Sequence, residues 1–364
     1  MNDTEYMKRA LRLARRGRTS PNPMVGAVIV SGGRIAGEGF HARAGEPHAE
    51  VMALRAAGEN ARGADMYVTL EPCRHTGRTP PCTQAIIRSG IRRVFAAMVD
   101  PDPNVAGGGI ADLRSAGVEV FCGLCEKEAS ELNAAYIKHR TTGTPLVTLK
   151  LAMSLDGKIA ARSGDSKWIT GERARALVHR ARAAADAVVV GAGTARADDP
   201  LLTARAGRTI RFPTRVVVAG RRPLPTGLRM LREPGETLVA VPESADPAAV
   251  EPLRAVGARV ILLPCSGDRV SIAGLMRELA RLGHLSVLIE GGAELAASAL
   301  AEQVVDRILF FYAPRIIGGR DSVPGVGGEG IESLDSAIGV DRLKMRRMGP
   351  DLAIEGHLVY PDTT

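Results

Sequence analysis

A chain of 364 residues, 45% of them hydrophobic, exceeds the length of one ordinary domain and can fill two cores. Only 3% of the residues are aromatic, the arginines behind the net charge of +8 are spread along the whole length, and no stretch is apolar enough to span a membrane, which argues against nucleic acid and membranes as partners. A small phosphorylated ligand accounts for the positive charge equally well.

Predicted helices and strands alternate through the first third of the chain. We expect helices over residues 4–16, 48–57, 82–89 and 112–116, and strands over residues 24–30, 34–40, 66–70, 94–99 and 118–122. The tight turn Ser31-Gly32-Gly33 joins the first two strands into a hairpin. This order predicts a three-layer α/β unit.

His48, Cys73 and Cys82 have the residue types and spacing of a zinc site. One imidazole and two thiolates occupy three tetrahedral positions and leave the fourth for a water whose pKa the metal lowers toward neutrality. Glu50, at the start of a predicted helix, lies close to such a metal without binding it and can carry protons. The pattern H-x-E followed by P-C-x-x-C is the signature of nucleobase deaminases. Each residue alone is more often a core histidine or a buried thiol, but the combination favours zinc.

Eight residues rather than two separate the cysteines in this chain. Within this insertion, Pro80 and Pro81 restrict the backbone just before Cys82 and keep its thiolate directed at the metal. His75 and Arg78 are then expected beside the zinc, where the guanidinium of Arg78 suits a phosphate or a carbonyl. We predict a stiffened substrate loop that leads into a helix, whose N-terminal N–H groups favour thiolates.

Cys122 and Cys125 form a C-x-x-C pair that we interpret as structural. A redox or metal role is the less favoured alternative, because no second C-x-x-C completes a four-thiolate site and the pair follows a predicted strand. With an odd count of five cysteines and no signal peptide at the N-terminus, the protein is expected in a reducing cytoplasm.

A linker over residues 141–145 follows a predicted helix over residues 127–140, and we place the domain boundary there. The second domain begins with a strand over residues 146–153. Strands over residues 186–191 and 286–290 each run into a glycine-rich turn and a helix, an arrangement that can cradle a nucleotide phosphate. Neither turn has the spacing G-x-G-x-x-G of a standard NAD fold, and a structural tight turn explains either one equally well.

Segments along nearly the whole chain resemble the bifunctional deaminase/reductase family of riboflavin biosynthesis. In the first domain they are Pro21-Asn22-Pro23, Gly39-Phe40-His41, His48-Ala49-Glu50 and the highly specific run Gly77-Arg78-Thr79-Pro80-Pro81-Cys82. In the second they are Ser154-Leu155-Asp156-Gly157, Trp168-Ile169-Thr170-Gly171, Gly191-Ala192-Gly193-Thr194 and Glu290-Gly291-Gly292. The resemblance implies an α/β protein, with a cytidine-deaminase-like three-layer α/β/α domain over residues 1–144 and a dihydrofolate-reductase-like α/β domain over residues 145–364.

The resemblance also implies ligands and their contacts. It implies one Zn²⁺ per chain at His48, Cys73 and Cys82, with Glu50 as the catalytic residue. Contacts to the deaminase substrate are implied for Asn22, His41, His75 and Arg78. NADPH is the implied cofactor of the second domain, with contacts at Ala152, Trp168, Thr194, Asp198, Gly292, Ala293, Glu294, Leu295, Ala296, Ala297 and Ser298. Contacts to the reductase substrate are implied for Lys150, Ser166, Arg182, Leu202, Arg205 and Glu290, of which the two arginines can clamp a phosphate.

Two successive reactions on one phosphorylated small molecule follow from the resemblance. A zinc hydrolase would deaminate a diamino-ribosylamino-pyrimidinone 5′-phosphate, and an NADPH-dependent oxidoreductase would then reduce its ribosyl group to ribityl. Two alternatives stay open. A nucleic-acid deaminase would need an aromatic groove that this composition lacks. A deaminase with a non-catalytic, nucleotide-sensing C-terminal domain is compatible with the fold, because a fold does not determine a function.

Two further expectations concern assembly and one loop. We expect a homo-oligomer, a dimer or higher, in which apolar strands over residues 308–312 and 352–354 pair across the interface. In Asp100-Pro101-Asp102-Pro103, the family usually carries asparagine at the third place. This departure puts only a local loop contact in doubt.

Overall fold

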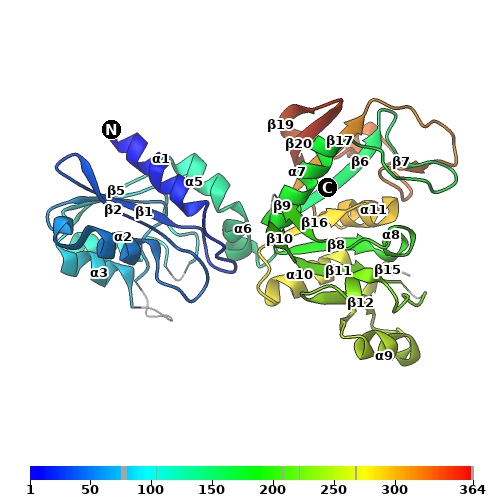
Figure 1. Cartoon of the computed structure of the whole chain (residues 1–364), viewed down its shortest axis with the longest axis horizontal. Helices are drawn as coiled ribbons and strands as arrows, with labels where there is room; N and C mark the ends of the chain where they lie inside the picture. Colours follow the sequence, from blue (N-terminus) through cyan, green and yellow to red (C-terminus); the bar gives the residue numbers. More distant parts are fainter. Residues whose placement is uncertain (75–79, 104, 207–208, 221, 267–268, 362–364) are drawn as a thin grey trace. The chain divides into compact units, whose positions relative to one another are not determined.

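The computed structural model describes residues 1–74, 80–103, 105–206, 209–220, 222–266 and 269–361. It divides into two compact units, Met1–Thr144 and Pro145–Thr364, which we call unit 1 and unit 2 (Figure 1). Each unit is built on a sheet of its own. None of the helices within the described ranges is long and apolar enough to cross a membrane.

Unit 1 is built on a five-stranded sheet in the order β2-β1-β3-β4-β5. The strands are β1 (Gly26–Ser31), β2 (Arg34–Phe40), β3 (Asp65–Val68), β4 (Arg93–Ala96) and β5 (Glu119–Cys122). β1 pairs antiparallel with β2 and with β3, whereas β3, β4 and β5 run parallel. The predicted hairpin is confirmed, because β1 and β2 are joined by the tight turn at residues 31–34.

Two glycines of β2 hold a helix of unit 1 close to the sheet. The first four helices of unit 1 are α1 (Asp3–Ala14), α2 (Ala49–Ala57), α3 (Cys82–Ser89) and α4 (Gly108–Ser115), with a short 3-10 helix at Gly58–Ala61. A Cβ atom added to Gly37 or to Gly39 would lie 2.3 Å from a carbonyl oxygen of α2. Because a larger residue would push the helix away, these glycines fix the position of α2, whose start carries His48 and Glu50.

The helix predicted over residues 127–140 is in fact two helices, α5 (Glu126–Leu132) and α6 (Ala134–Thr142), so this prediction was wrong. The chain leaves the helical conformation at Asn133 (φ −102°, ψ 19°). The buried Asn133 side chain accepts a hydrogen bond from Met24 N at 2.8 Å and donates one to Met24 O at 3.0 Å. These bonds outcompete a continuous helix and attach α6 to the segment before β1. The predicted linker is also shorter, because α6 runs to Thr142 before Gly143 ends it.

Unit 2 contains a nine-stranded sheet in the order β13-β12-β11-β8-β16-β6-β17-β20-β19. Its strands are β6 (Leu146–Ser154), β8 (Ala187–Gly191), β11 (Thr214–Val218), β12 (Thr237–Pro242), β13 (Arg259–Leu263), β16 (Ser286–Glu290), β17 (Arg307–Ala313), β19 (Gly339–Met348) and β20 (Asp351–Val359). The first seven in spatial order are parallel, and β20 and β19 follow antiparallel. Short pairs join β7 (Lys158–Ala160) to β18 (Val323–Pro324), β9 (Ala204–Ala206) to β10 (Thr209–Arg211) and β14 (Cys265–Ser266) to β15 (Arg269–Val270).

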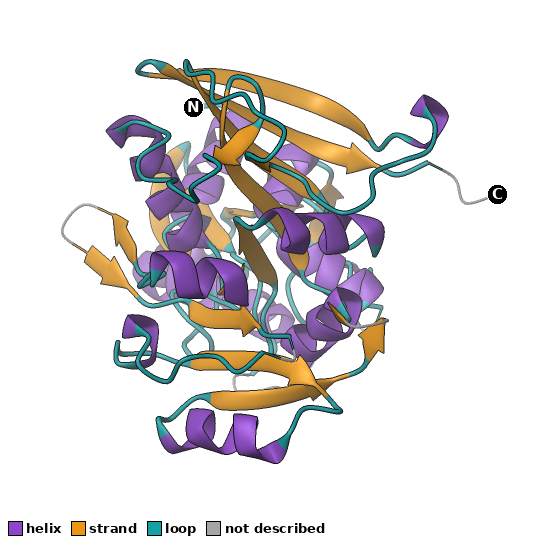
Figure 2. Cartoon of the chain, turned by 90° about the vertical axis from the view of Figure 1, so that its right-hand side faces the viewer, coloured by secondary structure: helices purple, strands orange, loops and turns teal. Residues whose placement is uncertain are grey.

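Helices cover both faces of this sheet (Figure 2). They are α7 (Glu172–Ala184), α8 (Ala192–Asp198), α9 (Pro247–Ala255), α10 (Ile272–Arg281) and α11 (Ala293–Ala301), with 3-10 helices at Arg229–Leu231 and Leu334–Ser336. Val189 of β8 packs with α10 and α11, whereas Val188 and Val190 pack with α8 and α9. Burial on both faces explains why this strand is apolar throughout, as is typical of parallel sheets.

The strands predicted at residues 308–312 and 352–354 pair with each other inside the chain, so the expectation that they pair across a dimer was wrong. They belong to β17 and β20, with Phe310 opposite Ile354 and Tyr312 opposite Leu352. β17 pairs with β6 on its other side, and β20 pairs with β19, so neither has a free edge. A sequence pattern predicts a strand but does not identify its neighbour.

Candidate active sites

The three predicted metal ligands converge in unit 1. His48 Nδ1 and the Sγ atoms of Cys73 and Cys82 all lie within 4.8 Å of one another. His48 Nδ1 lies 3.2 Å from Cys82 Sγ and 3.5 Å from Cys73 Sγ. Because Zn–S bonds are about 2.3 Å and Zn–N bonds about 2.1 Å long, ligand atoms around a tetrahedral zinc are separated by similar distances. The donor atoms and their spacing therefore fit a zinc ion.

Helix starts position two of these ligands. His48 is the residue before α2, and Cys82 is the first residue of α3. The main-chain N–H of Cys82 donates to Cys73 Sγ at 3.4 Å. A hydrogen bond from the Cys82 side chain lowers the pKa of Cys73 despite its burial, and the same hydrogen bond raises the pKa of Cys82. One thiolate is therefore favoured by the protein alone, and a divalent cation would stabilise the second.

Glu50 lies in the first turn of α2, outside the group of metal ligands. Its side chain lines the same cavity as His48 and Cys73, although the residue is only 3% exposed. Burial raises the pKa of Glu50 to about 7, and the nearby Cys73 contributes in the same direction. A carboxyl group in this environment can take up and release a proton beside the metal ligands.

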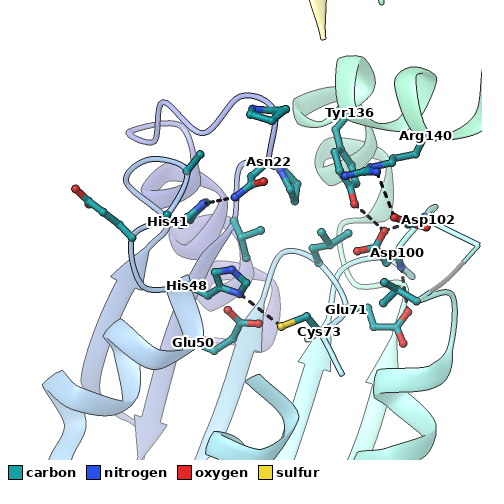
Figure 3. A pocket seen from close by; sticks show the side chains of 18 residues that line it. Asn22, His41, His48, Glu50, Glu71, Cys73, Asp100, Asp102, Tyr136 and Arg140 are labelled. Carbon is teal, nitrogen blue, oxygen red and sulfur yellow. Dashed lines mark hydrogen bonds and ion pairs between the residues drawn. The ribbon is translucent and has the colours of Figure 1, made fainter. Parts of the chain in front are cut away.

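A cavity of about 410 Å³ opens at these residues (Figure 3). Asn22 and His41, two predicted substrate contacts, lie in its wall with 3.1 Å between Asn22 Nδ2 and His41 Nε2. His41 Nδ1 lies 3.2 Å from Pro47 O, which can only accept, so Nδ1 carries the proton and Nε2 accepts from Asn22. Burial lowers the pKa of His41, which favours this neutral form. His75 and Arg78, also predicted to contact the substrate, lie outside the described residues.

Another part of the cavity wall was not anticipated from the sequence. Asp100, Asp102, Tyr136 and Arg140 line it (Figure 3). Tyr136 Oη donates to Asp100 Oδ1 at 3.1 Å, and Arg140 Nη1 lies 3.6 Å from Asp102 Oδ2. Glu71 supports this loop by accepting a hydrogen bond from the main-chain N–H of Asp100 at 3.0 Å. The sequence offered two signals: aspartate at position 102, where the family usually has asparagine, and the four-residue spacing of Tyr136 and Arg140 on α6. Neither signal locates these side chains at the pocket.

In unit 2, the two glycine-rich junctions lie at the C-terminal ends of neighbouring parallel strands. β8 leads into α8 at Gly191, and β16 leads into α11 through Gly291 and Gly292. The latter two glycines have φ values of 64° and 80°, and a Cβ atom on Gly292 would lie 3.2 Å from Thr194 Oγ1. Conformation and space both favour glycine here. The junctions meet at the C-terminal ends of the strands, which is where open α/β sheets bind their ligands.

Glu290, the last residue of β16, forms ion pairs with two of the cations predicted to contact the reductase substrate. Arg182 donates to its two oxygens at 2.5 and 2.9 Å, and Lys150 Nζ lies 3.8 Å from Oε2. Burial opposes the charge of Glu290, but Arg182 and Lys150 outweigh it and lower the pKa of Glu290 to about 2. Arg182 also donates to Thr203 O at 3.2 Å. Its guanidinium is thus engaged within the protein.

The loop that holds two predicted contacts is tied to α8. Lys167 Nζ lies 3.4 Å from Asp198 Oδ1, which brings the segment of Ser166 and Trp168 beside the end of α8. Trp168 is 64% exposed, and the guanidinium of Arg175 lies 4.8 Å from the centre of its ring. An exposed aromatic ring of this kind is available to stack on a ligand.

Other predicted contacts could reach a ligand only through their main chains. The side chains of Leu202, Leu295 and Ala296 are buried in the hydrophobic core. Arg205 differs, because its side chain is exposed while its main-chain N–H donates to His179 Nδ1 at 3.2 Å. Of the two arginines predicted to clamp a phosphate, Arg205 is therefore the more accessible.

Two family models match the chain. The RibD C-terminal domain matches residues 145–354, and the cytidine and deoxycytidylate deaminase zinc-binding region matches residues 1–98. The second match covers the three predicted metal ligands and Glu50. The expected fold, a cytidine-deaminase-like domain followed by a dihydrofolate-reductase-like domain, is confirmed by these matches and by the sheets described above.

Relatives of known name match almost the full length. The chain is 44% identical to the riboflavin biosynthesis protein RibD of Aquifex aeolicus, over 97% of each protein, and 41% identical to that of Escherichia coli, over 99% of this chain and 100% of the relative. Among solved structures, RibD of Acinetobacter baumannii superposes with a TM-score of 0.89 at 37% identity, covering 98% of this chain and 99% of the other. A diaminohydroxyphosphoribosylaminopyrimidine deaminase/5-amino-6-(5-phosphoribosylamino)uracil reductase from Thermotoga maritima gives 0.85 at 37% identity, covering 98% of each chain.

Proposed function

The chain belongs to the RibD family of riboflavin biosynthesis proteins. On this premise, we propose which of the two reactions each unit catalyses. It is a bifunctional enzyme, a deaminase and a reductase. We propose that unit 1 deaminates a diamino-ribosylamino-pyrimidinone 5′-phosphate by hydrolysis, and that unit 2 then reduces its ribosyl group to ribityl with NADPH. The observation that carries this proposal is the convergence of the ligand atoms of His48, Cys73 and Cys82 beside a pocket that is lined by His48, Cys73 and Glu50.

The residues of unit 1 suit a hydrolytic deamination. Zinc held by His48, Cys73 and Cys82 would act as a Lewis acid and lower the pKa of a bound water. Glu50 is placed to take a proton from the attacking water and to pass it to the departing ammonia, so that the ring carbon exchanges its amino nitrogen for oxygen. Asn22 and the neutral His41 ring would orient the pyrimidine above the ligands.

The residues of unit 2 suit the binding of a nucleotide and a sugar phosphate. NADPH would supply the hydride that reduces the ribosyl carbon. Thr194 and the start of α11 lie where the two junctions meet and would hold the cofactor's phosphates. Glu290 fixes Lys150 and Arg182 in place by charge, so that these partly buried cations can orient the sugar.

Arg205 is the residue that we expect to grip the phosphate in unit 2. Arg205→Lys should raise the KM for the reductase substrate by roughly tenfold and leave the KM for NADPH nearly unchanged, because an ammonium cannot reproduce the two parallel donors of a guanidinium. Steady-state NADPH oxidation by the full chain, with each ligand varied in turn, measures both constants. Arg254→Lys, at an exposed position of helix α9, is the matched control. An equal rise in both constants would instead indicate a general disturbance of unit 2.

Removal of zinc is expected to separate the two activities. After chelation, deamination should fall to background and return when Zn²⁺ is added back, whereas NADPH oxidation with already deaminated substrate should continue, because the metal ligands all lie in unit 1. The two rates are measured on the same chelated sample. Binding of NADPH without its oxidation by deaminated substrate would favour the nucleotide-sensing alternative for unit 2.

We propose the boundary at residue 145 as a true domain boundary, and a homo-oligomer in a reducing cytoplasm as the state of the protein. The sheet of unit 2 ends at β19, an exposed edge strand on which Leu343 and Met345 are 58% and 69% exposed. An edge of this kind can pair with a second copy, which supports the proposed oligomer. All five cysteines are free thiols, which supports a reducing compartment.

A further inference from the structure

Acidic side chains outnumber lysines and arginines in the described wall of the pocket in unit 1. Five carboxyl groups line it, those of Glu46, Glu50, Glu71, Asp100 and Asp102. Among the lining residues that the structure describes, Arg140 is the single lysine or arginine. A phosphorylated substrate would meet repulsion from such a wall unless a cation faced its phosphate.

The guanidinium of Arg140 is held by two neighbours and still has donors to offer. Arg140 Nη1 lies 3.6 Å from Asp102 Oδ2, and its Cζ lies 5.3 Å from the centre of the Tyr136 ring. The Asp102 side chain is 14% exposed, whereas that of Arg140 is 39% exposed. A guanidinium carries five N–H donors, and one carboxylate engages two of them at most, so Arg140 can bind a further anion.

The support behind Arg140 is itself fixed by hydrogen bonds. Tyr136 Oη donates to Asp100 Oδ1 at 3.1 Å, and the same oxygen accepts from Asp102 N at 2.9 Å. The buried carboxylate of Asp100 thus binds both neighbours of Arg140. It accepts hydrogen bonds from Tyr136, whose ring lies against the guanidinium, and from the main chain of Asp102, whose carboxylate pairs with that guanidinium. A guanidinium whose position is set before the ligand arrives loses less entropy on binding.

The position of Arg140 in the pocket matches the distal end of the substrate. Deamination requires the amino-bearing carbon at the metal ligands, so the ribosyl phosphate must extend away from them. Figure 3 shows Arg140 on a part of the wall well apart from His48, Glu50 and Cys73. Its side chain is also partly exposed to solvent.

We propose that Arg140 is a specificity-determining residue of the deaminase reaction, which recognises the phosphate of the pyrimidine substrate and is oriented by Asp102 and Tyr136. This inference rests on the proposed function, because it takes a phosphorylated pyrimidine as the substrate. Arg140 lies away from the reacting carbon, so its replacement should raise KM and leave kcat nearly unchanged.

The test compares the phosphorylated substrate with its dephosphorylated counterpart on the zinc-loaded full chain. Arg140→Met should raise the KM for the phosphorylated substrate roughly tenfold or more, because a charge-assisted contact is lost, while kcat stays within about threefold. The KM for the dephosphorylated form should not change. Arg140→Lys should give an intermediate KM, because it keeps the charge without the fork. Arg88→Met removes an exposed arginine of the same unit, on α3, and should leave both constants unchanged.

A double variant distinguishes direct contact between Arg140 and the phosphate from an indirect effect of the negative charge of Asp102. In Arg140→Met, the carboxylate of Asp102 loses its ion pair with Arg140, and Asp102→Asn removes the charge of that carboxylate as well. If Arg140 touches the phosphate, the double variant should still bind the phosphorylated form at least about fivefold more weakly than the unmodified protein does. Full recovery in the double variant, or an unchanged preference for the phosphorylated form in Arg140→Met, would overturn the inference. Failure of the unmodified protein to deaminate the phosphorylated pyrimidine would overturn the proposed function instead.

Discussion

Replacement of Glu50 by glutamine is expected to slow deamination by roughly a thousandfold or more while zinc stays bound. Glutamine has nearly the same shape as glutamate but cannot accept and return a proton, so the step in which a proton passes from water to ammonia loses its carrier. Zinc should remain, because Glu50 lies outside the group of three ligand atoms. The variant is measured for deaminase kcat and for zinc content per chain.

The second unit provides the internal control for this variant. NADPH oxidation with already deaminated substrate should be unchanged in Glu50→Gln, because Glu50 belongs to unit 1 and all the predicted reductase contacts belong to unit 2. Glu59→Gln makes the same chemical change at an exposed position of unit 1 and should leave both activities unaltered. A fall in deamination of less than about tenfold would remove Glu50 from the role of proton carrier. Parallel loss of both activities would indicate misfolding.

Most elements of unit 1 could be predicted, because their apolar periodicity and their breaks are local features of the sequence. The strand over residues 34–40 and the helix over residues 82–89 have the predicted bounds. The break at Asn133 could not be predicted, because it depends on hydrogen bonds to Met24, more than a hundred residues away. The pairing of β17 with β20 could not be predicted either, because several other apolar strands could have paired with β17.

The convergence of His48, Cys73 and Cys82 could be predicted, because a zinc ion restricts both the types and the spacing of the residues that bind it. The wall of Asp100, Tyr136 and Arg140 could not, since each residue is unremarkable until the fold brings α6 to the loop after β4. The same limit applies to Arg182. Its residue type suggested a phosphate contact, and the structure adds an ion pair between its guanidinium and the buried Glu290, a partner that the sequence alone could not identify.

Replacement of Cys82 by serine is expected to lower the zinc content well below one ion per chain and to abolish deamination. A serine hydroxyl is a much poorer zinc ligand than a thiolate at neutral pH, so two strong protein ligands would remain. Changes in residues that merely support a ligand already lower metal affinity about 10–100-fold, and the loss of a ligand itself should cost more. Metal analysis of the purified protein after dialysis, together with the deaminase rate, measures both effects.

Cys122→Ser is the matched control, and it also tests the interpretation of the C-x-x-C pair. Cys122 is exposed, and neither it nor Cys125 belongs to the group of converging ligand atoms found among the described residues. One zinc per chain and full deamination should therefore persist in this variant, while Cys82→Ser loses both and keeps its NADPH oxidation. Zinc loss in Cys122→Ser would mean that the pair takes part in metal binding. Full zinc and full deamination in Cys82→Ser would show that the metal is held by a different set of residues, because two remaining ligands cannot retain it with the original affinity.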